Sequence, residues 1–144
     1  MRSPAFIFAG FTLLLFSVFS ARSSFGFTSK SEMAASIAAR IVYVTAPTEL
    51  VARNISRSII KSRLAACVNI VPGITSIYEW DNKVEESSEV LMIIKTRQEI
   101  IEDLMKEVLK LHPYDVPEFI SLPVEDGSEP YLKWVQEQTK KAPQ

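Results

Sequence analysis

Cysteine, histidine and glycine are scarce in this chain of 144 residues, which contains one cysteine, one histidine and four glycines. A single cysteine excludes an intramolecular disulfide framework and a CxxC metal site. A single histidine excludes a metal centre built from several histidines. The sequence also lacks the GxGxxG, Walker, GxSxG and HExxH signatures. We therefore predict no catalytic residues and expect a protein that is not an enzyme.

A surplus of basic residues is also lacking. The whole chain carries 16 Lys and Arg against 17 Asp and Glu, which gives a formal net charge of −1. From position 33 onward, 13 basic residues face 16 acidic ones. Because such a domain has no broad basic face for a phosphate backbone, we do not expect nucleic acid to be a partner.

Apolar residues gather at the N-terminus, where seven of the eight phenylalanines lie within the first 27 positions. Arg2 is followed by an uncharged stretch whose apolar centre is about 15 residues long, whereas a membrane-spanning helix needs roughly 20. This pattern predicts that residues 1–22 form a signal peptide or signal anchor for the secretory pathway or a membrane. The segment is also Ser-rich and almost free of acidic residues, so import into an organelle (mitochondrion or chloroplast) is the alternative.

Residues 23–39 show little periodicity and are predicted to be a linker, followed by one domain over 40–140 and a tail at 141–144. The β-branched and aromatic run at 41–45 predicts a strand that is buried on both faces. Thr48 can then cap a helix whose apolar stripe extends to Leu64. The domain is therefore expected to begin with a strand and a helix.

The next two predicted strands form an unusually long hairpin. Residues 67–80 form one arm with a break or bulge at Pro72-Gly73, Asp81-Asn82 forms the turn, and residues 83–95 return. The spacing places Val84, Val90, Met92 and Ile94 on one face. Arms of about 13 residues exceed the usual strand of five or six, and their exposed edges need a cover. Another subunit is the simplest way to cover these edges.

The second half of the domain is predicted to contain a helix, a short strand and a last helix. The capping-box pattern at 96–99 predicts a helix that ends near His112 and buries residues 100, 101, 104, 105, 108 and 109. A short strand over 118–122 and a last helix capped by Ser128 follow. The order β-α-β-β-α-β plus a terminal helix predicts an α+β, ferredoxin-like sandwich with two right-handed crossovers.

His112 begins a short segment that contains several ionisable side chains. The sequence from His112 to Glu118 gathers an imidazole, the phenol of Tyr114 and the carboxylates of Asp115 and Glu118. A histidine at a helix C-terminus also serves simply as a cation that the helix dipole favours. Alternatively, an imidazole with carboxylates can bind a first-row divalent metal, and a thiolate from Cys67 would favour copper. With so few protein ligands, such a site would be weak or completed by a neighbouring subunit.

The other candidate side chains also have two interpretations. Cys67 follows an apolar segment, which indicates an inert thiol, whereas a Cys67–His112 nucleophilic pair would indicate an enzyme. Lys95 either extends to the rim of the domain or contacts an anion in a cleft. Tyr78 and Trp80 share a strand face that favours packing over ligand stacking. The predicted lining of a ligand cleft consists of Lys95, Tyr78, Trp80 and Tyr114.

Eight short segments together resemble the CutA divalent-cation-tolerance family. In family order they are VTAP (44–47), LAACVN (64–69), IVPGI (70–74), SIYEW (76–80), IKT (94–96), HPY (112–114), PE (117–118) and YLKW (131–134). Each segment is weak alone, but the ordered set is specific and covers about residues 41 to 135. The apolar leader is similar to the N-terminal extensions of eukaryotic members.

This resemblance implies a ferredoxin-like subunit in a tight homotrimer, with the long hairpins pairing between subunits. It also implies binding of Cu²⁺ or another divalent cation, a link to metal tolerance and homeostasis, and no established enzymatic activity. The alternative is a trimeric scaffold or signalling module that binds a partner protein or a small anion between subunits. Animal members are associated with membrane anchoring of a cell-surface esterase, so a membrane-anchoring role belongs to this alternative.

Overall fold

The computed structural model describes residues 38–139 of the chain. Its elements are β1 (Ala39–Ala46), α2 (Glu49–Lys61), β2 (Cys67–Trp80), β3 (Lys83–Arg97), a 3₁₀ turn η1 (Gln98–Ile100), α3 (Ile101–Leu111), β4 (Ile120–Pro123) and α4 (Glu129–Gln138). The predicted signal segment and tail, and all but the end of the predicted linker, lie outside the described residues. Strand β1 begins at Ala39, the last residue of the predicted linker.

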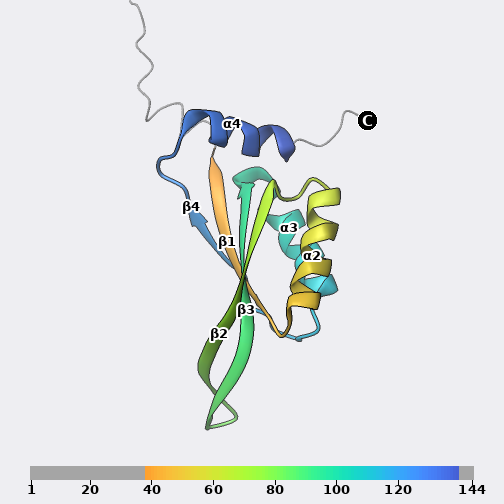
Figure 1. Ribbon diagram of the computed structural model, residues 1–144, viewed down its shortest axis with the longest axis vertical. Coiled ribbons are helices and arrows are strands. Elements are labelled where there is room, and N and C mark those ends of the chain that lie inside the picture. The colour runs from red at the N-terminus through yellow and green to blue at the C-terminus, as the bar shows by residue number, and fades with distance from the viewer. Residues whose placement is uncertain (1–37, 140–144) are drawn as a thin grey trace, which may run out of the picture.

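The four strands form one sheet in the order β2-β3-β1-β4, and all neighbouring strands are antiparallel. Strand β1 pairs with β3 from Ala39–Arg97 to Ala46–Val90 and with β4 on its other side. Each of α2 and α3 therefore connects two parallel strands that have a third strand between them (Figure 1). This split βαβ arrangement confirms the predicted ferredoxin-like α+β fold.

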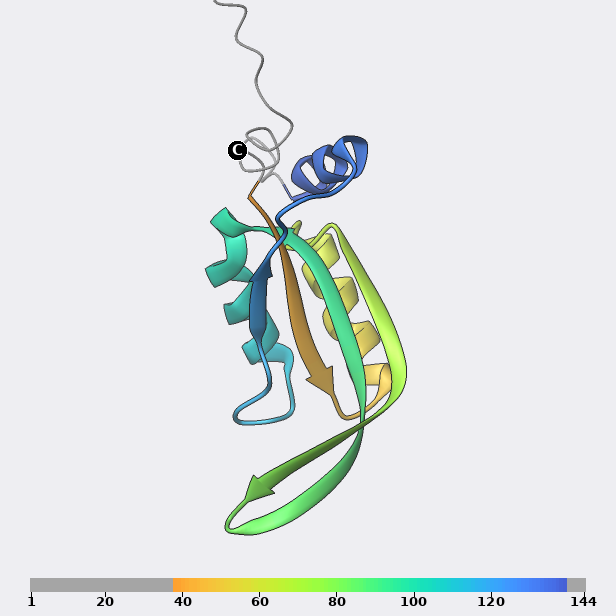
Figure 2. The same cartoon turned by 90° about the vertical axis from the view of Figure 1, so that its left-hand side faces the viewer.

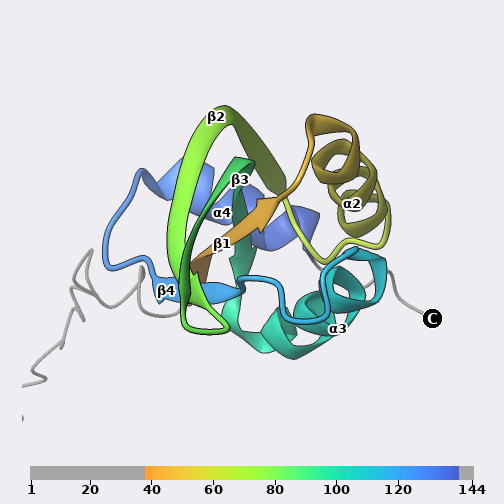
Figure 3. The ribbon, with the colours of Figure 1, turned by 90° about the horizontal axis from the view of Figure 1, so that it is seen from below.

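Helices α2 and α3 cover the same face of the sheet (Figure 3). Alternate strand residues such as Val44 and Met92 point toward them, because side chains along a strand alternate between faces. The helices contribute Ile55 and Leu104 to the same fully buried core. The predicted N-cap of α2 is confirmed, since Thr48 Oγ1 accepts a hydrogen bond from the Val51 amide at 3.2 Å.

The predicted capping box before α3 is wrong. Strand β3 continues to Arg97, a 3₁₀ turn follows, and α3 begins only at Ile101. The Thr96 hydroxyl donates instead to the Leu64 carbonyl at 2.7 Å, which connects β3 to the loop after α2. The buried side of the helix is also narrower than predicted, because Met105 and Leu109 are exposed.

The long hairpin extends beyond the helix-covered part of the sheet (Figure 2). The predicted bulge is confirmed by a register shift between Val71 and Ile74, with Gly73 at φ +76°. Asp81 and Asn82 form the turn with φ of 50° and 60°, as their tolerance of positive φ favours. Val84 was expected on the same face of β3 as Val90, Met92 and Ile94; those three are buried, whereas Val84 lies near the turn and is 75% exposed.

The sheet face opposite α2 and α3, here called the open face, is largely apolar. Strand pairing places Ile41 beside Leu122, Tyr43 beside Ile93 and Ile120, and Val71 beside Leu91. All seven side chains retain some contact with solvent in the single chain. Apolar groups in this arrangement would gain stability from a further layer of protein.

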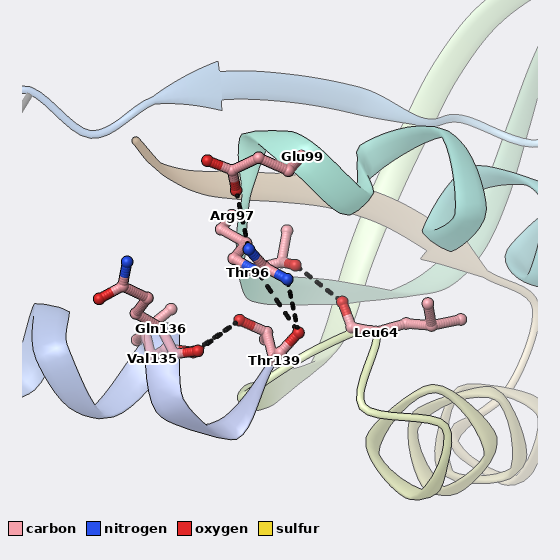
Figure 4. Close-up of polar contacts among 7 residues, drawn as sticks. All are labelled: Leu64, Thr96, Arg97, Glu99, Val135, Gln136 and Thr139. Carbon is pink, nitrogen blue, oxygen red and sulfur yellow. Dashed lines mark hydrogen bonds and ion pairs between the residues drawn. The ribbon is translucent and has the colours of Figure 1, made fainter. Parts of the chain in front are cut away.

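Helix α4 lies across the end of the sheet and is held at its C-terminus (Figures 1 and 4). Arg97 Nε and Nη2 donate to the Thr139 carbonyl at 3.3 and 3.2 Å, while Arg97 Nη1 lies 3.4 Å from a Glu99 carboxylate oxygen. The buried Thr139 hydroxyl donates to the Val135 carbonyl at 2.8 Å. Ser128 occupies the predicted N-cap position, but its side chain makes no capping hydrogen bond.

Candidate functional site

A cavity of about 740 Å³ lies between the hairpin and the segment that connects α3 to β4. This pocket is the candidate functional site. Its lining residues are Thr45, Ser76, Tyr78, Trp80, Glu85, Glu89, Pro113, Tyr114, Asp115, Val116 and Glu118. Four of these residues are acidic, three are aromatic, and none is lysine, arginine or histidine.

His112 positions the segment that forms one wall of the pocket. Its imidazole is only 8% exposed, and its Nε2 lies 2.8 Å from the Thr45 carbonyl oxygen, to which it donates. The other ring nitrogen, Nδ1, accepts from the Tyr114 amide at 3.1 Å. This pattern assigns a neutral imidazole, rather than the helix-end cation that the sequence suggested. Because both nitrogens are engaged, neither is free to bind a metal ion in this arrangement.

Glu89 is the most enclosed acid of the pocket and is only 7% exposed. One of its carboxylate oxygens accepts from the Ser76 hydroxyl at 2.6 Å. Burial raises the pKa of Tyr114, and a hydrogen bond to Glu89 together with the charge of Glu89 raises it further. Glu89 therefore stands among hydroxyl groups without a basic side chain beside it in the pocket lining.

Glu118 lies close enough to Glu89 for the two carboxylates to repel each other. Burial is the larger cause that raises the pKa of Glu118, and the charge of Glu89 adds to it. The ion pairs Arg53–Glu49, Arg97–Glu99 and Lys110–Glu107 lie outside the pocket lining. None of them neutralises a carboxylate of the pocket, so its negative charge would favour a bound cation.

Three predicted cleft residues do come together in the pocket. Tyr78 and Trp80 come from strand β2, and Tyr114 faces them from the α3–β4 segment. The Tyr78 hydroxyl lies 3.0 Å from the Ser87 hydroxyl oxygen across the hairpin, which fixes one aromatic wall. The rings of Tyr114 and His112 contact edge to face, with centroids 5.0 Å apart.

Cys67 and Lys95 lie elsewhere, at the other end of the sheet. They are opposite each other on β2 and β3, beside Ile41, whereas the His112 contact is to Thr45. Four residues along β1 separate these two positions by about 14 Å. Lys95 donates to the Asn69 side chain and to the Ile93 carbonyl, and Cys67 interacts with Tyr131 of α4. The structure therefore does not bring Cys67 to the other predicted metal ligands.

The part of the chain that the structure describes contains no group of three or more His, Cys, Asp and Glu side chains arranged to hold a metal ion. Asp115 and Glu118 both line the pocket, so the two predicted carboxylates share one site. His112 adjoins them but uses its nitrogens internally. Among the helices within residues 38–139, none is long and apolar enough to cross a membrane.

The sequence did not identify Glu85, Glu89 or Ser76 as site residues. Residues 85–89 form a polar run that is typical of a solvent-exposed strand. A signal was nevertheless present, because the period of two places Glu89 on the same face as the apolar residues Leu91 and Ile93. What the sequence does not reveal is that the α3–β4 segment covers this part of the hairpin.

Comparison with known proteins agrees with this fold. The family model described as "CutA1 divalent ion tolerance protein" matches residues 40–138. The solved structure of the Thermus thermophilus divalent cation tolerance protein, Cut A1, superimposes with a TM-score of 0.70 at 46% identity. That match covers 71% of this chain and 99% of the other. CutA1 from Oryza sativa gives a TM-score of 0.70 at 45% identity, covering 72% and 95%.

The chain therefore shares its overall fold with these solved structures. It is 54% identical over 98 residues to "Protein CutA" of Mus musculus, which covers 68% of this chain and 55% of the mouse protein. It is also 45% identical over 127 residues to "Protein CutA, chloroplastic" of Arabidopsis thaliana, covering 88% and 70%. The chain belongs to the CutA1 divalent ion tolerance family, and it spans about half the length of the mouse relative.

Proposed function

We propose that this chain forms a homotrimer that binds divalent cations, with Cu²⁺ as the first candidate, and that it acts in metal tolerance without catalysing a reaction. Membership of a family that is named for divalent ion tolerance supports the cation. The observation that carries the proposal is the pocket itself, in which four carboxylates gather with no basic side chain in the lining.

Asp115 and Glu118 are the proposed metal ligands within one chain. Both line the pocket, and carboxylate oxygens are suitable ligands for divalent cations. His112 would join them only if it gave up a hydrogen bond, to Thr45 or to the Tyr114 amide. Cys67 could contribute only to a separate site at the other end of the sheet. The bound ion would therefore be held weakly, or its coordination would be completed by another subunit.

Calorimetric titration with CuCl₂ tests this assignment. The combined variant Asp115→Asn and Glu118→Gln should weaken Cu²⁺ binding by more than about tenfold, because it removes both charged ligands. The matched control is Glu102→Gln, which removes an exposed carboxylate of α3 outside the pocket. Cys67→Ser in parallel reports on the thiol. Unchanged Cu²⁺ affinity in the combined variant would refute the carboxylate site.

Assembly into a trimer is supported by the open face and by the hairpin. The open face presents Ile41, Tyr43, Leu91 and Ile93 near the centre of the sheet without full burial. The hairpin exposes large side chains, including Trp80 at 61%. Long unpaired strand edges and apolar faces are the features that other protein chains cover. Burying them between copies would also stabilise a small domain.

Analytical ultracentrifugation of the purified chain tests the assembly. The expected result is a species with three times the mass of one chain. Leu91→Glu should disrupt this species, because it places a charge on the open face. Leu109→Glu is the matched control, since Leu109 is exposed on α3, on the side of the sheet away from the open face. A stable monomer at micromolar concentration would refute the trimer and would favour a different protein as the partner of the open face.

The destination of the protein is a separate proposal that rests on residues 1–22. We propose that they direct the chain to the secretory pathway or a membrane, and organelle import is the alternative. The Arabidopsis thaliana and Oryza sativa relatives that are named chloroplastic support the alternative. N-terminal sequencing of the mature protein, with fractionation of the cells, distinguishes the two. A mature start near Arg22 in the secretory fraction supports secretion, and recovery from organelles supports import.

A further inference from the structure

We propose that the pocket between the hairpin and the α3–β4 segment binds an organic cation: an ammonium or guanidinium group carried on a short carbon chain. This ligand differs in class from the divalent metal ion of the proposed function, and its binding does not require a metal. The residues that carry the inference are Glu85, Glu89, Tyr78, Trp80 and Tyr114, which come from the two arms of the hairpin and from the opposite wall.

The negative charge of the pocket favours a bound cation. Glu89 is only 7% exposed, and its carboxylate accepts hydrogen bonds from the neutral hydroxyls of Ser76 and Tyr114. Burying a carboxylate without an opposite charge is costly, and no basic side chain lines this pocket. A positively charged group seated beside Glu89 would offset this cost.

The dimensions of the pocket leave room for an organic cation in addition to the metal position proposed at Asp115 and Glu118. A cavity of about 740 Å³ is within the roughly 300–1,000 Å³ range of small-molecule sites. Its acids are spread over the hairpin and the α3–β4 segment, and they form no group of three arranged around one metal position within the described chain. A molecule with a carbon chain can contact carboxylates on both walls of the pocket at once.

The aromatic side chains supply a second, independent reason. Tyr78, Trp80 and Tyr114 line the same cavity as the carboxylates. The faces of such rings attract ammonium and guanidinium groups electrostatically, and the rings also provide apolar contact for a carbon chain. Carboxylates and aromatic rings together match an amine more closely than an anion or a neutral sugar.

The probe for this site is 1,4-diaminobutane, which is a dication at neutral pH. The chain contains two tryptophans, so Trp134→Phe leaves Trp80 as the single tryptophan reporter in the pocket. Protein stripped of metal with EDTA and then dialysed is titrated with three compounds: 1,4-diaminobutane, uncharged 1,4-butanediol, and Mg²⁺ of the same charge. We expect a saturable change of Trp80 fluorescence with the diamine, at least about tenfold tighter than with the diol or Mg²⁺.

Two variants locate the binding. Glu89→Gln keeps the shape and hydrogen-bonding capacity of the side chain but removes its charge, and should weaken diamine binding by more than about tenfold. Glu85→Gln, which changes an exposed lining residue, provides a second test if the buried substitution unfolds the protein. Glu102→Gln outside the pocket should leave binding unchanged. Diamine binding that is absent, equal to that of Mg²⁺, or insensitive to both pocket variants would overturn the proposal.

Sedimentation with and without 1,4-diaminobutane identifies the natural source of the cation. Unchanged sedimentation with bound diamine indicates a pocket that is open to free organic amines. A diamine that binds and lowers the mass of the assembly indicates that a lysine or arginine of another copy normally fills the pocket. Both outcomes support recognition of an organic cation. Cu²⁺ binding is measured separately, so failure of the metal site and failure of this proposal are distinguishable.

Discussion

Replacing His112 with alanine separates a structural histidine from a metal ligand. The ring is 8% exposed and bridges the Thr45 carbonyl at 2.8 Å and the Tyr114 amide at 3.1 Å. Alanine would leave both backbone groups without these partners, and an unsatisfied buried polar group costs about 1–3 kcal/mol. Water can reach part of Tyr114, which is 40% exposed, so the combined loss should fall near 2–4 kcal/mol.

Urea denaturation followed by tryptophan fluorescence measures this loss in buffer that contains EDTA. The variants are compared at equal chain concentration, because assembly makes the apparent stability depend on concentration. His112→Asn should retain part of the stability, since its amide oxygen can accept from the Tyr114 amide. Asp115→Asn changes an exposed candidate ligand and serves as the control.

A small effect of His112→Ala in EDTA would contradict a structural role for the imidazole. If His112→Ala lowers the free energy of unfolding by less than about 0.5 kcal/mol in EDTA, the two hydrogen bonds do not hold the pocket wall. If the variant loses stability only relative to copper-loaded protein, His112 is a metal ligand. The imidazole would then have to leave the Thr45 carbonyl or the Tyr114 amide when copper binds.

Three further predictions concern stability. Leu104→Ala in the core should cost about 2–5 kcal/mol in urea denaturation, whereas alanine at exposed Leu109 should cost less than about 1 kcal/mol. Gly73→Ala should cost about 1 kcal/mol through backbone strain alone, because φ is +76° and an added Cβ has open space around it; no loss of stability would contradict the left-handed bulge. Glu118→Gln should stabilise metal-free protein at pH 7. Burial, with repulsion from Glu89, raises the pKa of Glu118 in the folded chain, so ionisation lowers stability as the pH rises through that pKa. The gain should vanish below about pH 4, where the carboxyl group is protonated in both states, and a gain independent of pH would contradict this origin.

Local signals in the sequence predicted most of the fold. Pro72-Gly73 and Asp81-Asn82 specify backbone shapes that few other residue pairs adopt easily, so the bulge and turn were predicted at their positions. Thr48 likewise caps α2 through a contact only three residues away. Each of these features depends on residues that are close together in the sequence, so the sequence alone predicts them.

Predictions failed where a distant residue competed with a local pattern. Thr96 had the sequence of a capping box, but its hydroxyl donates to Leu64, 32 residues away. His112 had the position of a helix-end cation, but the Thr45 carbonyl, 67 residues away, accepts from its ring. Glu89 had the surroundings of a solvent-exposed strand, and only the covering α3–β4 segment makes it a pocket residue. These contacts arise from tertiary packing, which local propensity does not encode.

The position of β1 has a consequence for the order in which the chain can fold. Among residues 38–139, the first strand to be synthesised is a central strand of the sheet, and both of its neighbours, β3 and β4, come later. After Ala46 has been made, the ribosome must add 51 residues to reach Arg97, the end of β3. At about 5–20 residues per second, β1 waits roughly 3–10 s for its first partner. During that interval the β-branched run at 41–45 is an exposed, aggregation-prone strand that a chaperone acting on unfolded chains could bind.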